Sequence, residues 1–201
     1  MNVLVAYATR HGATAGIAQR IVETLRREGL HADVVSVAEV TRLERYDAVV
    51  LGGAAYMFHW LKDATSFAKR HRAELAQRPV WLFSSGPLGS DLVDEAGHDM
   101  RDAARPKEFA ELAGLLRPRG EEVFFGAYDP AQKPIGLGER VTRMMPAAKH
   151  AMPAGDFRDW ERIDAWAKQI AQQLTSRSDP PARTQDGSQS LGSDGSPKDR
   201  Y

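Results

Sequence analysis

Hydroxyl, glycine and basic residues gather in one short segment near the start of the chain. The segment is Thr9-Arg10-His11-Gly12-Ala13-Thr14, and an amphipathic helical pattern follows it. A helix N-terminus offers unpaired backbone N–H groups and the positive end of the helix dipole. Gly12 lets the backbone approach an anion closely, and Arg10 and His11 add positive charge. These features predict a phosphate-binding loop.

A simple helix cap is the alternative interpretation of the same residues, because Thr9 or Thr14 alone is able to cap a helix after a tight turn. The segment is not G-x-G-x-x-G and lacks the G-K-[ST] ending of a P-loop. A dinucleotide site and an ATPase site are therefore disfavoured. These residues alone do not decide between a helix cap and a phosphate-binding loop.

Two further segments contain residue types that suit a planar ligand. Residues 54–60 include Tyr56, Met57, Phe58 and Trp60, and aromatic rings favour offset stacking. The alternative is a hydrophobic staple onto the next helix. Residues 84–89 are mostly small, so their backbone N–H and C=O groups are able to reach the polar edge of a ring. An ordinary loop is the alternative there.

Short apolar runs alternate with amphipathic helical patterns along the chain. Strands are expected at 3–7, 34–37, 48–53, 80–86 and 122–127, and helices at 13–28, 61–75, 107–116 and 160–174. Continuously apolar strands indicate a sheet buried on both faces. We therefore predict an α/β fold with a doubly wound, five-stranded parallel sheet and helices on both faces. We choose the strand order 2-1-3-4-5, although the pattern also permits the other common order.

Ligands in such a sheet bind at the carboxyl ends of the strands, beside the point where the strand order reverses. The three chemically interesting segments follow the first, third and fourth predicted strands. We therefore expect them at one edge of the sheet. An aspartate-phosphorylated receiver domain is disfavoured, because the first and third strands end on Tyr7-Ala8 and Gly52-Gly53 rather than on acidic residues.

Composition excludes several functions. The chain has 27 basic and 27 acidic residues and no cysteine. Zero net charge does not favour nucleic acid as a partner, and the lack of cysteine removes thiol nucleophiles, disulfides and thiolate metal sites. No metal-site spacing such as H-E-x-x-H is present. No signal peptide or membrane-spanning run is recognised, so we expect a cytoplasmic protein.

The stretch from Val5 to Thr14 resembles the phosphate-loop signature of the flavodoxins, and the resemblance extends from Met1 to about Leu174. It implies the 2-1-3-4-5 sheet with FMN as the cofactor. By this resemblance, the phosphate is held by Thr9, Arg10, His11, Gly12, Ala13 and Thr14. Ala55, Tyr56, Met57 and Phe58 flank the isoalloxazine ring on one side, and Ser85, Gly86, Pro87 and Leu88 approach it from the other.

One branch of the family fits best. Residues 155–167 resemble the closing helix of the menaquinone-dependent protoporphyrinogen dehydrogenases, and Phe125-Gly126-Ala127 also suits that group. The resemblance implies an FMN-dependent oxidoreductase that takes two electrons from a reduced small-molecule substrate and passes them to a quinone-type acceptor. No side chain is assigned a catalytic role. The alternatives are a flavodoxin-type electron carrier and a binding module of this fold that has lost FMN.

Three expectations concern the end of the chain. Residues 128–153 mix basic and apolar side chains, which suits a lid, a quinone site or, through residues 131–150, a peripheral membrane contact. Residues 1–175 are expected to form the FMN-binding domain and residues 176–201 a disordered polar tail. Asp156 and Asp159 are expected to cap the last helix, where carboxylates favour the positive end of the dipole. No oligomeric state follows from the sequence.

Overall fold

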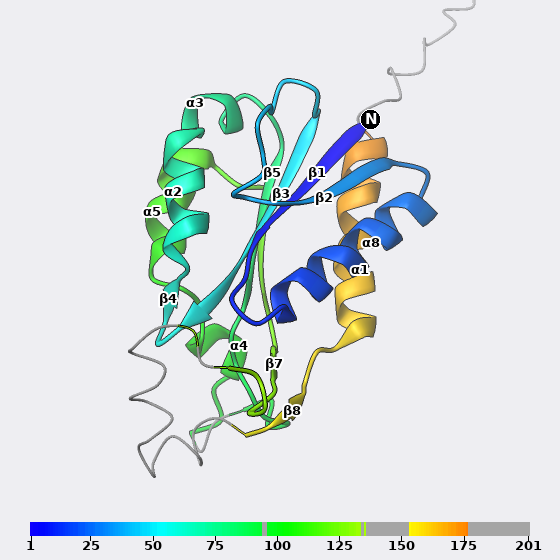
Figure 1. Cartoon of the computed structure of the whole chain (residues 1–201). Helices are drawn as coiled ribbons and strands as arrows, with labels where there is room; N and C mark the ends of the chain where they lie inside the picture. The colour runs from blue at the N-terminus through cyan, green and yellow to red at the C-terminus, as the bar shows by residue number, and fades with distance from the viewer. Residues whose placement is uncertain (94–95, 134, 136–152, 177–201) are drawn as a thin grey trace, which may run out of the picture.

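The computed structural model describes residues 1–93, 96–133, 135 and 153–176. They form a doubly wound α/β domain in which helices cover both faces of a central sheet (Figure 1). Residues 134 and 136–152 of the basic and apolar segment 128–153, and the predicted tail apart from Ser176, lie outside the described residues.

The five predicted strands form one parallel sheet. They are β1 (Asn2–Ala8), β2 (His31–Ser36), β3 (Ala48–Tyr56), β5 (Val80–Ser85) and β6 (Gly120–Phe124). Their order is β2-β1-β3-β5-β6, which confirms the predicted 2-1-3-4-5 order. Three short strands were not predicted. β4 (His59–Trp60) pairs antiparallel with β3, and β7 (Ala127–Tyr128) pairs with β8 (Gly155–Asp156).

All five predicted strands differ from the observed ones at one end or both, and β6 ends at Phe124 rather than at 127. The largest shifts at the amino ends are in β2 and β6, the two strands at the edges of the sheet. β2 begins at His31, and β6 begins at Gly120 and includes Glu121 and Glu122. Edge strands tolerate polar residues, since one side of the strand has no neighbour in the sheet. An apolar pattern therefore underestimates their length at the polar end.

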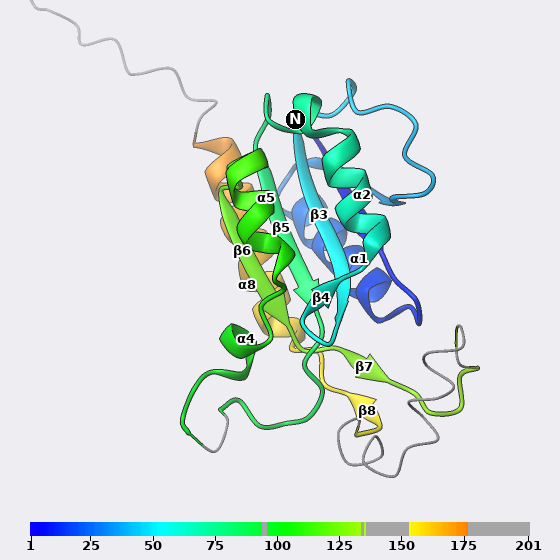
Figure 2. The same cartoon turned by 90° about the vertical axis from the view of Figure 1, so that its left-hand side faces the viewer.

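The helices are divided between the two faces (Figures 1 and 2). α1 (Ala13–Arg27) and α8 (Trp160–Thr175) cover one face, and α2 (Lys62–Arg70), α3 (Arg72–Leu75) and α5 (Glu108–Leu116) cover the other. The short α4 (Met100–Ala103) was not predicted. The single helix predicted at 61–75 is wrong, because His71 leaves the helical region and its ring pairs with Glu74. None of the helices in the described ranges has the length and hydropathy of a membrane span.

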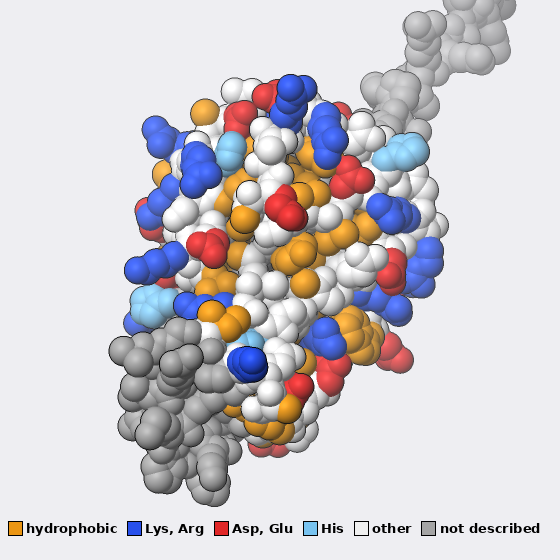
Figure 3. Space-filling model, in the orientation of Figure 1, with side chains coloured by type: hydrophobic (Ala, Val, Ile, Leu, Met, Phe, Trp, Pro, Cys, Tyr) orange, Lys and Arg blue, Asp and Glu red, His pale blue; other side chains and the backbone are white. Residues whose placement is uncertain are grey.

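Each face of the sheet has its own hydrophobic core, so successive residues of a strand enter opposite cores. Val3 and Val5 pack with Ile17 and Ile21 of α1, whereas Leu4 packs with the α2 and α5 side. This alternation explains why the strands are continuously apolar. Basic and acidic side chains are interspersed over the face in Figure 3, in keeping with the zero net charge.

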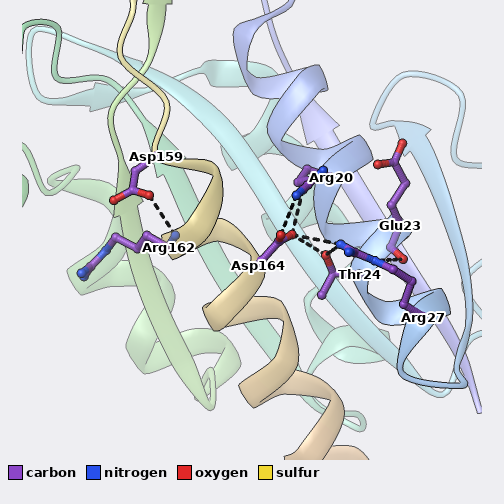
Figure 4. A network of polar contacts seen from close by, with 7 residues as sticks. All are labelled: Arg20, Glu23, Thr24, Arg27, Asp159, Arg162 and Asp164. Carbon is purple, nitrogen blue, oxygen red and sulfur yellow. Dashed lines mark hydrogen bonds and ion pairs between the residues drawn. The ribbon is translucent and has the colours of Figure 1, made fainter.

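A polar clamp joins α1 to α8 outside the first core (Figure 4). The Asp164 carboxylate accepts hydrogen bonds from Arg20 at 2.8 and 2.6 Å, from the Thr24 hydroxyl at 2.6 Å and from Arg27 at 3.2 Å. The hydrogen bond from Arg20 is the main reason why the pKa of Asp164 lies below its ordinary value. The clamp fixes α1, whose N-terminus carries the predicted phosphate loop.

Replacing Asp164 by asparagine should lower the free energy of unfolding by about 1–2 kcal/mol at pH 7, because three donors lose a charged acceptor. A carboxylate with a lowered pKa stabilises the fold above its unfolded pKa of about 3.9 and ceases to do so below its folded pKa. The difference from the parent protein should therefore persist at pH 5 and shrink below pH ~4. Urea unfolding across this pH range measures it.

The matched control is Glu111→Gln, which removes the exposed ion pair between Glu111 and Lys69. Its effect on the free energy of unfolding should stay within about 0.5 kcal/mol, as for other ion pairs on a protein surface. Equal effects of the two substitutions would contradict the clamp.

Candidate functional site

The sheet register brings the three predicted loops to one edge. Ala8 at the end of β1 lies beside Gly53 of β3, and Ala54 of β3 lies beside Ser85 at the end of β5. Parallel strands end on the same side of a sheet, so the loops after β1 and β5 and the end of β3 are neighbours. Figure 1 shows this edge at the lower end of the sheet.

The first loop leaves the N-terminus of α1 open. Gly12 is the N-cap residue in a left-handed conformation with φ 85°, and no side chain accepts the N–H groups of the first turn. Thr9 is used within the loop, where its hydroxyl accepts the Gly12 N–H at 3.0 Å. A Cβ built on Gly12 would have no atom within 4 Å apart from Gly12 and its two chain neighbours. A helix N-terminus without a side-chain cap, at the positive end of the helix dipole, fits a phosphate group.

A buried hydrogen bond connects the first loop to the third. The hydroxyls of Thr14 and Ser85 are 2.8 Å apart, and both residues are buried. The prediction placed Thr14 against a phosphate and Ser85 against a ring. The structure shows in addition that each holds the other's loop in position. A hydroxyl both donates and accepts, so this bond leaves further hydrogen-bonding capacity on both side chains.

The second loop is a tight hairpin with two bulky residues at its tip. β3 and β4 pair Tyr56 with His59, which leaves Met57 and Phe58 as the turn, with φ values of 50° and 64°. Turns with two positive φ values normally contain Asn and Gly. Bulky residues here are strained. The side chains of Met57 and Phe58 are nevertheless 87% and 54% exposed, so the strain presents apolar groups to solvent.

The hairpin contacts both of the other loops. The Arg10 guanidinium lies over the Tyr56 ring at 5.0 Å from its centroid. A Cβ on Gly86 would lie 3.3 Å from the Cβ of Ala55, so the second and third loops are close together. With the Thr14–Ser85 hydrogen bond, every pair of the three loops is in contact. Arg10 was predicted as a phosphate ligand, and in this structure its side chain lies on the hairpin.

The third loop is held by the strand beside it. The Gly86 N–H donates to the Phe124 carbonyl at 3.2 Å, and the Gly126 N–H donates to the Pro87 carbonyl at 2.9 Å. Pro87 is buried and Leu88 is half-buried. The loop is thus fixed from the β6 side, and its other side faces Ala55.

Trp60 and its neighbour His59 have structural partners. Trp60 is only 3% exposed and donates its indole N–H to the Gly53 carbonyl, so it belongs to the core, as the staple alternative proposed. His59 pairs with Glu108 at 2.8 Å. Partial burial would raise the pKa of Glu108, but hydrogen bonds from the Trp60 N–H and from His59 outweigh it and lower that pKa.

The two aspartates before α8 have different roles. Asp159 accepts the Arg162 N–H at 2.9 Å and caps the helix, as predicted. Asp156 does not cap it. Its carboxylate binds the Arg158 guanidinium at 2.8 and 2.6 Å, and this pairing lowers its pKa. The sequence pattern missed Arg158, because an arginine outside the loops carries no signal of its own.

A cavity of about 320 Å³ adjoins the third loop on the β6 side. Its lining includes the apolar Phe124, Phe125 and Phe157 as well as three arginines, Arg101, Arg158 and Arg162. Each arginine is paired with a carboxylate, namely Asp99, Asp156 and Glu122 respectively. The helices that begin beside this cavity, α4 and α8, are capped by Asp99 and Asp159, whereas the N-terminus of α1 has no side-chain cap. The predicted phosphate site is therefore the loop after β1 and not this cavity.

The sheet order and the open loop at its edge define a flavodoxin-type domain. The flavodoxin domain family matches residues 4–141 of the chain. Since this match spans more than half of the sequence, the chain belongs to that family. Membership of this family implies that the chain binds a flavin.

Individual relatives agree with this assignment. The chain is 26% identical over 182 residues to the Escherichia coli K12 protein named protoporphyrinogen IX dehydrogenase [quinone], which covers 85% of this chain and 95% of the relative. An archaeal flavodoxin structure has a TM-score of 0.53 at 15% sequence identity, and the match covers 87% of this chain and 99% of that one. The structure of flavodoxin 1 from Bacillus cereus has a TM-score of 0.53 at 13% sequence identity, and the match covers 87% of this chain and 99% of that one. At these identities the structures show the fold alone.

Removing either hydroxyl of the Thr14–Ser85 pair should destabilise the cofactor-free protein. Thr14→Val and Ser85→Ala should each cost about 1–3 kcal/mol, because each leaves the other hydroxyl buried without its partner. The double variant should cost less than the sum of the two. Chemical unfolding of all four proteins completes the cycle. Additive effects would contradict direct coupling of the two loops.

Proposed function

We propose that this chain binds FMN at the edge of the sheet and is an FMN-dependent oxidoreductase. One observation carries the proposal: the three loops contact one another around the open N-terminus of a long helix. Family membership supports a flavin as the ligand. The fold alone would not decide the function, which depends on this site.

The residues divide into two groups by what they offer FMN. The first-turn N–H groups of α1 and the loop Thr9–Thr14 would hold the phosphate. The hairpin at Ala55–Phe58 and the loop at Ser85–Leu88 would hold the isoalloxazine ring between them. Apolar groups at the hairpin tip would exclude water from the ring and orient it. Bound FMN supplies two-electron chemistry, so no protein nucleophile is needed.

We further propose a reduced small-molecule substrate and a quinone-type electron acceptor. The name of the Escherichia coli relative, a quinone-dependent protoporphyrinogen IX dehydrogenase, supports this choice. Met57 and Phe58 support it as well, because exposed apolar side chains at the mouth of a site suit an apolar redox partner. Without turnover of its own, the same site would serve an electron carrier.

The first experiment is the visible spectrum of the purified protein after FMN is added and the excess is removed. The parent protein should retain flavin bands. Ala13→Asp should lose them, because a carboxylate in the first turn of α1 repels the phosphate but favours the helix dipole, so the fold is kept. Unfolding by heat checks that the variant remains folded.

The matched control is Ala110→Asp, which places the same carboxylate in the first turn of α5, on the opposite face of the sheet from α1. This variant should retain FMN. A parent protein that never retains FMN would contradict the oxidoreductase function and favour a binding module. We choose Ala13 rather than Thr14 for the test, because Thr14 is fully buried and a carboxylate there would also disrupt the fold.

The second experiment measures turnover by the FMN-loaded protein. We expect protoporphyrinogen IX oxidation to depend on a soluble quinone and to stop in Ala13→Asp. Quinone-dependent oxidation of a different reduced substrate would support the reaction class and exclude only the porphyrinogen. Bound flavin without any quinone-dependent turnover would favour the electron carrier.

A further inference from the structure

An arginine from a distant part of the chain lies against the first turn of α1. Nη1 of Arg158 donates to the Ala13 carbonyl at 3.4 Å. A Cβ on Gly16 would lie only 2.3 Å from the same Nη1 atom. The guanidinium therefore occupies the space that a side chain at position 16 would need. Ala13 and Gly16 are the first and fourth residues of α1, the helix whose N-terminus is the proposed phosphate site.

The guanidinium is held in place from several sides. Nε and Nη2 bind the Asp156 carboxylate at 2.8 and 2.6 Å, and the guanidinium carbon lies 4.4 Å from the centroid of the Trp160 ring. The segment before it is anchored by the pairing of β8 with β7 and by the Phe157 N–H, which donates to the Gly126 carbonyl at 3.0 Å. These contacts fix the position of the guanidinium charge.

The ion pair between Asp156 and Arg158 has a defined orientation relative to α1. Asp156 engages the Nε and Nη2 edge, and Nη1 is the nitrogen directed at α1. The Asp156 side chain is 47% exposed and the Arg158 side chain 18%. Water therefore screens the carboxylate more than the guanidinium. The pair presents its positive side to the first turn of α1, where it adds to the helix dipole.

We propose that Arg158 is a further residue of the phosphate site, where it supplies positive charge through the first turn of α1, and that Gly16 makes room for it. The inference rests on the proposed binding of FMN. It adds to the loop Thr9–Thr14 a cation from the segment between β8 and α8. Because the charge acts on the phosphate, it should distinguish FMN from riboflavin, which has the same ring system and no phosphate.

The test compares the Kd values of FMN and riboflavin by fluorescence titration of the cofactor-free protein. Arg158→Gln should weaken the binding of FMN about five- to tenfold at low salt and leave the Kd of riboflavin unchanged. This is the effect expected for one charge acting on a dianion across a partly screened distance. Arg158→Lys should retain most of the FMN affinity. The loss should diminish at high salt.

Gly16→Ala tests the position of the charge without removing it. Alanine is the better helix former by about 1 kcal/mol, so the fold should be kept. The new methyl group should displace the Arg158 guanidinium and weaken the binding of FMN, but not that of riboflavin. In the Arg158→Gln background the same substitution should have no further effect on FMN.

The control is Arg162→Gln, since Arg162 extends away from α1 (Figure 4) and pairs with Glu122. It should leave the FMN to riboflavin ratio unchanged. An unchanged affinity for FMN in Arg158→Gln, or equal losses of affinity for FMN and riboflavin, would overturn the role of Arg158 while FMN binding stands. A parent protein that binds neither ligand would overturn the proposed function and this inference with it.

Discussion

The hydrogen bond between Thr14 and Ser85 is the interaction on which the site depends. It lies in the interior, where an unpaired hydroxyl is costly, so each residue enforces the position of the other. Thr14 stands in the first turn of α1, and Ser85 ends β5. The bond therefore couples the helix that would receive the phosphate to the strand that carries the third loop. The Asp164 clamp secures the same helix against α8.

Local strain is concentrated at the same edge of the sheet. Met57 and Phe58 break the usual rule for hairpin turns, and the apolar groups that they expose gain nothing from burial. Departures of this kind are expected where a residue serves function rather than folding. The contrast with Trp60 is informative. It lies two residues beyond the turn, and there the chain returns to ordinary core packing.

The parallel sheet was predictable, because continuous apolar strands alternate with amphipathic helices. Its strand order followed only from the resemblance to the flavodoxins, since the pattern also permits the other common order. The loops were predictable for a similar reason, since the carboxyl ends of parallel strands share one edge. The pairing of Thr14 with Ser85 and the place of Arg158 were not, because both depend on contacts between segments distant in sequence. β4, β7 and β8 were missed because two-residue strands have no periodicity. The break at His71 was missed because the apolar pattern continues through it.

Hydrogen exchange of the backbone amides, with and without FMN, tests the central claim most directly. The claim is that three loops form one site. FMN should slow exchange in residues 9–15, 55–58 and 85–88 together, with little change at the amino ends of the strands. Protection of only one loop, or protection confined to the lining of the cavity beside β6, would contradict the account.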